Sequence, residues 1–110
     1  MRRTSSSRRS RIRAKIRIRF TRSARHQFLA ALAYIHRDSP SAAVMFRRKT
    51  EQALRRLQQV PQSGHVIPEF PELPHREVRV VSYRLFYRLV GRAIWVIGFW
   101  HGAQQPDEEA

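Results

Sequence analysis

The first patterned stretch of the chain alternates apolar and basic residues. In "KIRIRFT", Ile16, Ile18 and Phe20 occupy every second position, and Lys or Arg occupies the positions between them. This period of two is typical of a β-strand that buries one face and leaves the other in water. We therefore expect a strand over residues 15–21 with a basic outer face.

Two helices are expected next, because the apolar spacing changes from two residues to three or four. Thr21 is suited to cap a helix over residues 22–38, and Ser39 followed by Pro40 is suited to start a second helix over residues 40–60. We expect the two helices to form an antiparallel hairpin. The apolar stripe of the first comprises Phe28, Leu32 and Ile35, widened by Leu29 and Ala33, and that of the second comprises Ala43, Phe46, Thr50, Ala53, Leu57 and Val60.

The remainder of the chain reads as a connector followed by strands. The segment "PQSGHVIPEFPELPH" holds four prolines and a glycine, which predicts an extended connector. Three strands are then expected in "REVRVV", "SYRLFYRL" and "AIWVIGFW", with a hairpin turn around Gly91 and Arg92 before the last. The pattern as a whole predicts an α+β fold with an N-terminal strand, a helix hairpin and a three-stranded antiparallel meander.

The alternation within these strands predicts two different sheet faces. The face that the helices should cover carries Tyr83, Leu85, Tyr87 and Leu89. The opposite face is expected to be open and carries Arg79, Arg84, Phe86 and Arg88. It lies beside the strand over residues 93–100, which is apolar on both sides. Such a surface suits an anionic and partly apolar partner; the alternative is that the arginines are only solvated, with their stems over apolar neighbours.

Length and composition limit the chain to one domain. Its 110 residues allow one modest core, and its longest apolar run, residues 93–100, is far shorter than the roughly 20 residues of a membrane span. The chain has no cysteine, which excludes disulfides, zinc–thiolate sites and thiol nucleophiles. A soluble protein in a reducing, cytoplasmic environment is expected.

The net charge of +14 is unevenly spread. Residues 1–15 hold seven of the 22 basic residues and no acidic residue, and residues 16–110 hold fifteen basic against eight acidic residues, a net charge of +7. We expect a disordered Arg/Ser-rich arm over residues 1–14, a folded domain over 15–105 and an acidic tail over 106–110. Such charge suits nucleic acid or an acidic protein partner, or serves solubility alone.

Residue patterns for most enzyme chemistry are missing from the sequence. The five histidines lack the spacing of metal ligands, and there is no Gly-rich phosphate loop, carboxylate pair or Ser/His/Asp set. We therefore expect no metal and no cofactor. His101, at the end of the last strand, is the one candidate acid or base, and a structural hydrogen-bonding role is the alternative.

The order of strand, helix hairpin and meander resembles the RelE/ParE superfamily of small bacterial toxins from type II toxin–antitoxin systems. The resemblance covers about residues 15–105 and rests on "VIPEFPELPHREVRV", "SYRLFYRL" and "WHGAQ" in this order. It implies a cytoplasmic toxin held by a cognate antitoxin in a hetero-oligomer, with no membrane partner. From the exposed apolar and cationic positions, we expect antitoxin contacts at Phe28, Leu32, Arg79, Arg84, Phe86, Arg88, Trp95 and Trp100.

The resemblance implies two competing activities. RelE-like members are ribosome-dependent endoribonucleases that use cationic side chains and a late Tyr or His, whereas ParE-like members inhibit DNA gyrase. The nuclease cations carry over to Arg79 and Arg84. After His101, however, the chain continues "GAQQPDEEA", where the nuclease pattern needs another cation and an aromatic proton donor. This incomplete set and the "WHGAQ" ending favour a gyrase inhibitor that is not an enzyme.

Two alternatives stay open at this point. One is a RelE-like endoribonuclease that cuts messenger RNA on the ribosome through Arg79, Arg84 and His101. The other is a non-catalytic nucleic-acid-binding module that uses the Arg-rich arm and the helix cations. Binding by such a module would fall steeply as the salt concentration rises, because phosphate contacts would dominate it.

Overall fold

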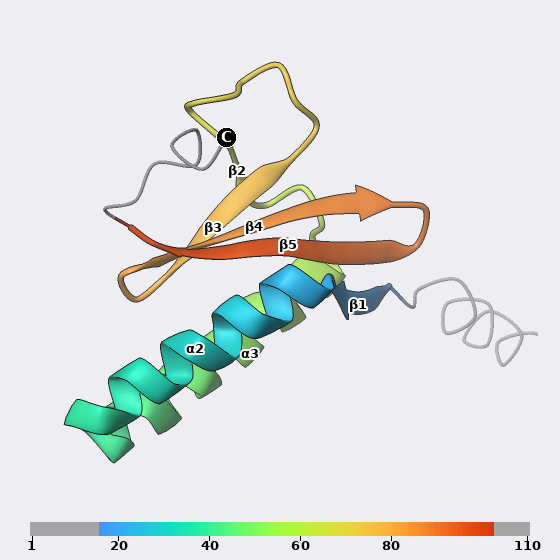
Figure 1. Ribbon diagram of the computed structural model, residues 1–110. Helices are drawn as coiled ribbons and strands as arrows, with labels where there is room; N and C mark the ends of the chain where they lie inside the picture. Colours follow the sequence, from blue (N-terminus) through green and yellow to red (C-terminus); the bar gives the residue numbers. More distant parts are fainter. Residues whose placement is uncertain (1–15, 103–110) are drawn as a thin grey trace, which may run out of the picture.

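The computed structural model describes residues 16–102, so the arm predicted at residues 1–14 and the tail predicted at 106–110 lie outside the described residues. Its elements are β1 (Arg17–Phe20), α2 (Arg22–Asp38), α3 (Pro40–Gln59), β2 (His65–Val66), β3 (Arg76–Val80), β4 (Tyr83–Val90) and β5 (Ala93–His101). The strands form one sheet in the order β1-β5-β4-β3-β2. Both helices lie side by side on one face of this sheet (Figure 1). The expected α+β fold is confirmed.

Two side-chain caps set the bounds of the helices. The Thr21 hydroxyl accepts a hydrogen bond from the Ala24 amide, and the Ser39 hydroxyl accepts one from the Ala42 amide, each at 3.1 Å. Pro40 then occupies the first turn of α3, where its missing N–H costs nothing. The predicted bounds of α2 are therefore confirmed, and α3 ends one residue earlier than predicted.

The core lies between the helix hairpin and one face of the sheet. Phe28 of α2 and Phe46 of α3 pack against Phe99 of β5, with ring centroids 5.2 and 5.9 Å away. Tyr83 of β4 lies 5.2 Å from Phe46. Four aromatic rings from four elements thus form one cluster, which fixes the hairpin against β4 and β5.

The buried stripe of the helices is narrower than the sequence predicts. Leu29 and Val60 are 53% and 51% exposed, and Ala33 is exposed as well, so their assignment to the stripe was wrong. The fully covered positions of α2 are the small residues Ala24 and Ala31, which lets the helix approach the sheet along one narrow row. Successive residues of a helix are rotated by about 100° around its axis, so the residue next to a buried position points away from the sheet.

A β-bulge in β5 shifts which of its residues face the core. Tyr87 pairs with Val96, whereas the preceding residue of β4 pairs with Gly98, so Ile97 has no partner across the ladder. The extra residue inverts the alternation. Val96 before the bulge and Phe99 after it are both buried in the core, although three positions separate them.

The turns on either side of β4 need left-handed backbone conformations. Gly91 has a φ of 60° in the β4–β5 turn, which lies where the sequence predicted it. Val81 has a φ of 58° and is 60% exposed in the turn between β3 and β4. The sequence had placed Val81 in the strand, and this was wrong. A β-branched residue is strained in this conformation.

The connector after α3 is held close to the sheet. The Tyr87 hydroxyl accepts a hydrogen bond from the Gly64 amide at 2.9 Å and donates one to the Pro61 carbonyl at 2.8 Å. A Cβ at Gly64 would lie 2.5 Å from the Tyr87 hydroxyl oxygen, so only glycine allows this approach. The connector also forms the short strand β2, which pairs with β3 and which the sequence pattern did not indicate.

Candidate functional site

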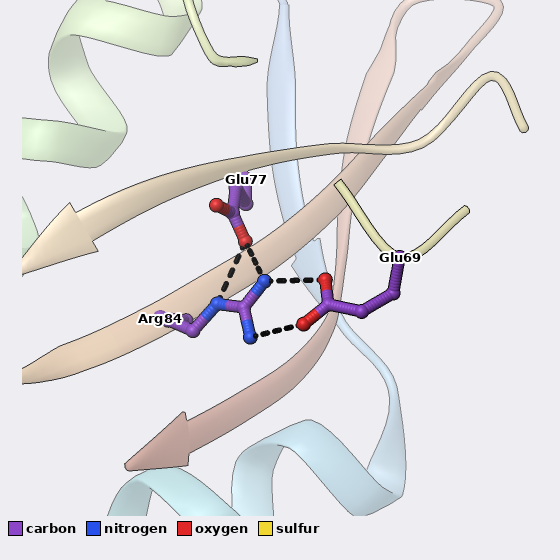
Figure 2. A network of polar contacts seen from close by, with 3 residues as sticks. All are labelled: Glu69, Glu77 and Arg84. Carbon is purple, nitrogen blue, oxygen red and sulfur yellow. Dashed lines mark hydrogen bonds and ion pairs between the residues drawn. The ribbon is translucent and has the colours of Figure 1, made fainter. Parts of the chain in front are cut away.

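The side chain of Arg84 lies between two carboxylates on the sheet face that the helices leave uncovered. Its Nη1 and Nη2 donate to the two oxygens of Glu69 at 3.0 and 2.8 Å, and its Nε donates to Glu77 Oε1 at 2.8 Å. Figure 2 shows the guanidinium between the two acids, one from the connector and one from β3. Arg84 is only 5% exposed, so this is a buried ion cluster.

The electrostatics of the cluster follow from these contacts. The hydrogen bonds from Arg84 hold the pKa of Glu69 below its ordinary value, and burial opposes this effect only in part. The same bond to Glu69, followed by the bond to Glu77, raises the pKa of Arg84. Two carboxylates against one guanidinium leave a net charge of −1. The cluster therefore offers no positive charge to an approaching phosphate.

The strand register and the connector bring these three residues together. Glu77 pairs with Phe86 across the β3–β4 ladder, so it lies diagonally next to Arg84 on the same face. Glu69 arrives from the connector, beyond two prolines that follow α3. Neither acid was predicted as a partner of Arg84. The period of two in β3 puts Glu77 on the same face as Arg79, but no local pattern indicates where Glu69 folds back.

The expected exposure of Arg84 and Phe86 was wrong. Each is only 5% exposed. The connector lies over this part of the face, where it supplies Glu69 and the apolar residues Ile67, Phe70 and Leu73. The Arg84 guanidinium lies 5.1 Å from the centroid of the Phe86 ring and adds a cation–π contact.

A small apolar hollow of about 200 Å³ remains between the connector and the sheet. It is lined by residues of the sheet and of the connector: Phe86, Ile97, Gly98 and Trp100 from the sheet, and Ile67, Phe70, Leu73 and His75 from the connector. The Nδ1 atom of His75 is buried without a hydrogen-bond partner among the described residues. Burial, followed by the positive charge of Arg88, lowers the pKa of His75 and keeps the ring neutral.

The three residues carried over from the nuclease pattern do not converge. Arg79 pairs with Arg84 across the ladder and lies on the same face, but it is exposed whereas Arg84 is buried. His101 packs edge-on against Tyr83, 5.4 Å between ring centroids, and Tyr83 belongs to the helix-facing core. The sheet therefore separates His101 from the Arg84 cluster.

The residues predicted to contact an antitoxin are scattered over the molecule. Phe28 and Leu32 pack partly into the core, and Trp100 lines the hollow under the connector. Trp95 lies beside β1 at the other margin of the sheet, where it pairs with Arg19. Arg88 is exposed, as predicted. The structure describes no single patch that contains all of them.

Two further features bear on partners. Within residues 16–102, no group of three His, Asp or Glu side chains gathers closely enough to hold a metal ion. Neither α2 nor α3, the helices of the described chain, is long and apolar enough to cross a membrane.

Similarity to known proteins agrees with the fold. The family model of the ParE toxin of the type II toxin–antitoxin system parDE matches residues 18–106. A solved structure titled "Chromosomal ParDE TA system from P. aeruginosa" aligns with a TM-score of 0.64 at 20% identity and covers 80% of this chain and 97% of that one. A YoeB/ParE toxin from Agrobacterium tumefaciens aligns with a TM-score of 0.53 at 14% identity and covers 78% and 98%. A search of curated proteins finds no match. Because the family model spans most of its length, the chain belongs to the ParE toxins of type II toxin–antitoxin systems.

Proposed function

We propose that the free chain inhibits DNA gyrase and that a cognate antitoxin neutralises it by direct binding in the cytoplasm. Membership of the ParE family supports the toxin activity. The similar structure from P. aeruginosa belongs to a ParDE system, which supports an antitoxin partner for this chain. The basic surface supports the same partner, because an acidic, amphipathic segment would neutralise its charge.

The pairing of Arg84 with two carboxylates is the observation that favours gyrase inhibition over RNA cleavage. In a RelE-like nuclease, as the resemblance implies, a cation at this position stabilises the charge that develops on the phosphate. Here the Arg84 guanidinium already donates its hydrogen bonds to Glu69 and Glu77, and the net negative charge of the cluster repels RNA. His101 lies across the sheet and cannot act on the same phosphate as Arg84.

A supercoiling assay with purified gyrase tests this proposal. Micromolar toxin is expected to block ATP-dependent supercoiling of relaxed plasmid and to leave messenger RNA on translating ribosomes intact. Relaxation by a type I topoisomerase is the control, because it uses the same DNA without gyrase. Normal supercoiling together with codon-specific cleavage of the RNA would overturn the proposal in favour of an endoribonuclease.

The same assay distinguishes specific inhibition of gyrase from general nucleic-acid binding. If phosphate contacts alone caused the inhibition, the effect would fall steeply between about 50 and 200 mM salt. It would also fall on deletion of residues 1–14 and would extend to the type I enzyme. We expect inhibition to be specific to gyrase and to persist in the deleted chain.

A further inference from the structure

The outer side of α3 presents hydrogen-bond donors along most of its length. The helix lies beside α2 on the sheet (Figure 1), and its buried residues point towards these two elements. Over residues 48–59, every exposed side chain except Glu51 can donate a hydrogen bond, and none is apolar. These donors are Arg48, Lys49, Gln52, Arg55, Arg56 and Gln59. Such a row suits a partner that is rich in oxygen acceptors.

Four of these donors carry a positive charge that no carboxylate of the described chain neutralises. The acid of this stretch, Glu51, already pairs with Arg47 at 3.6 Å across one turn of the helix. The other ion pairs of residues 16–102 belong to the Arg84 cluster on the far face of the sheet. The cations that are left without an acidic partner in this part of the chain are Arg48, Lys49, Arg55 and Arg56.

The four cations form two pairs that lie two helical turns apart. Arg48 and Lys49 are each followed seven residues later by another cation, Arg55 and Arg56. Seven residues correspond to about 10.5 Å along a helix axis. The minor groove of B-form DNA is about 6 Å wide, so two pairs with this separation can reach the phosphates on both sides of it. Gln52 lies between the pairs and can donate to backbone oxygens there.

The basic N-terminal segment joins the fold at one end of this row. The Gln58 side-chain amide donates to the Ile16 carbonyl at 2.7 Å, so the described chain begins next to the last turn of α3. Residues 1–15 hold seven basic residues and no acidic residue. Their positive charge is therefore connected to α3 at the end that carries Arg55 and Arg56, which extends the same attraction for a polyanion.

The composition of the row selects duplex DNA among the anionic partners. Protein interfaces have an apolar core with aromatic anchors, and the exposed positions over residues 48–59 lack both. Single-stranded nucleic acid is held largely by stacking of its bases on aromatic side chains, and this stretch has none. The minor groove of an RNA duplex is wide and shallow, so the two pairs of cations do not span it.

We propose that the chain has a second activity, in which α3 binds duplex DNA across the minor groove. Arg48 and Lys49 contact phosphates of one strand, and Arg55 and Arg56 contact phosphates of the other. The side of α3 that packs on the sheet takes no part, so the fold is unchanged on binding. This inference rests on the row of cations and does not use the assignment of gyrase as a target.

Fluorescence anisotropy with a labelled DNA duplex of about 20 base pairs tests the contact in the full chain. Each phosphate contact contributes about 0.9 to the slope of log K against log salt concentration, so the four cations contribute about 4 × 0.9 = 3.6. The variant Arg48→Gln/Lys49→Gln/Arg55→Gln/Arg56→Gln should lose this part of the slope. Wild-type affinity should therefore fall about a hundredfold more than that of the variant between about 50 and 200 mM salt. An unchanged slope would overturn the proposal.

A matched variant removes four exposed arginines that lie outside α3. Arg19→Gln/Arg22→Gln/Arg25→Gln/Arg88→Gln makes the same change in net charge and is expected to alter the slope by less than about 1. Equal losses in the two variants would show a diffuse attraction and would overturn the assignment to α3. The variant Arg48→Lys/Arg55→Lys/Arg56→Lys should keep the wild-type slope, because a phosphate contact needs only the charge. Loss of the slope in this variant would also overturn it.

Unlabelled competitors distinguish the other nucleic acids. Duplex DNA should displace the probe at a concentration at least about tenfold lower than single-stranded DNA or an RNA duplex of the same length. Equal displacement by either would overturn the contact with two strands of a B-form groove. Gyrase inhibition is measured on the same preparations. DNA binding through α3 without inhibition would reject only the proposed function, and inhibition without such binding would reject only the DNA surface.

Discussion

Removing Arg84 tests whether the ion cluster holds the connector on the sheet. Arg84→Met deletes the guanidinium and leaves Glu69 and Glu77 close together. The side chains of Arg84, Glu69 and Glu77 are 6%, 20% and 11% exposed, so water screens the two remaining charges poorly. Breaking one partner of a buried ion pair costs about 3–5 kcal/mol. We expect a loss of about 3 kcal/mol, because Glu69 keeps part of its hydration.

Urea unfolding at pH 7, followed by tryptophan fluorescence, measures this loss. Arg79→Met is the matched control, because Arg79 pairs with Arg84 across the ladder but is exposed. Its effect should stay within about 0.5 kcal/mol. A loss of less than about 1 kcal/mol in Arg84→Met would show that the ion cluster does not hold the connector on the sheet, because breaking a buried ion pair destabilises a protein by more than this.

The pH dependence of the same variant gives a second check. In the wild-type chain the pKa of Glu69 is lowered, so its stabilising contribution is present above the ordinary value of 4.5 and is lost as the pH falls through the folded-state value. Arg84→Met lacks this contribution, so the gap between the two chains should narrow in acid. If Arg84→Met does not fold at pH 7, the triple variant with Glu69→Gln and Glu77→Gln should recover stability, since no charge is then buried.

Three smaller predictions concern the backbone and His75. Val81→Asn should raise the free energy of unfolding by about 1 kcal/mol, because Asn tolerates the left-handed conformation, and an unchanged or lower value would contradict this. Gly64→Ala should cost about 2 kcal/mol through its clash with the Tyr87 hydroxyl; denaturant midpoints equal to wild type would exclude that clash. The pKa of His75 is lowered by burial, so wild-type stability should fall as the pH drops below 6.5 towards the folded-state value. His75→Phe should lose this part of the pH dependence, and parallel stability profiles of the two chains would contradict the assignment.

Local chemistry made the order and type of the elements predictable. Thr21 and Ser39 fixed the helix starts because a capping hydroxyl acts on its own neighbours. The period of two also placed Arg79 and Arg84 on the same face of the sheet. These features depend on residues close together in the sequence, and such features are visible without the fold.

Features that depend on distant residues were not predictable. The sequence gives no sign that Glu69 folds back onto Arg84, because Glu69 lies in a proline-rich connector that has no periodic pattern. Ile97 is indistinguishable from its apolar neighbours, so the bulge that inverts β5 was hidden as well. The candidate site was consequently expected to be an open cationic face, whereas the structure has a covered ion cluster with an apolar hollow beside it.

Expression of the chain in bacteria with two simultaneous readouts distinguishes gyrase inhibition from RNA cleavage. One is a DNA-damage reporter, and the other is a map of transcript ends on translating ribosomes. The proposed function predicts induction of the damage reporter without new transcript ends at codons, because a gyrase inhibitor causes DNA damage and does not cut RNA. Codon-specific cleavage without damage would contradict it, since Arg84 would then have to leave its two carboxylates and act on RNA.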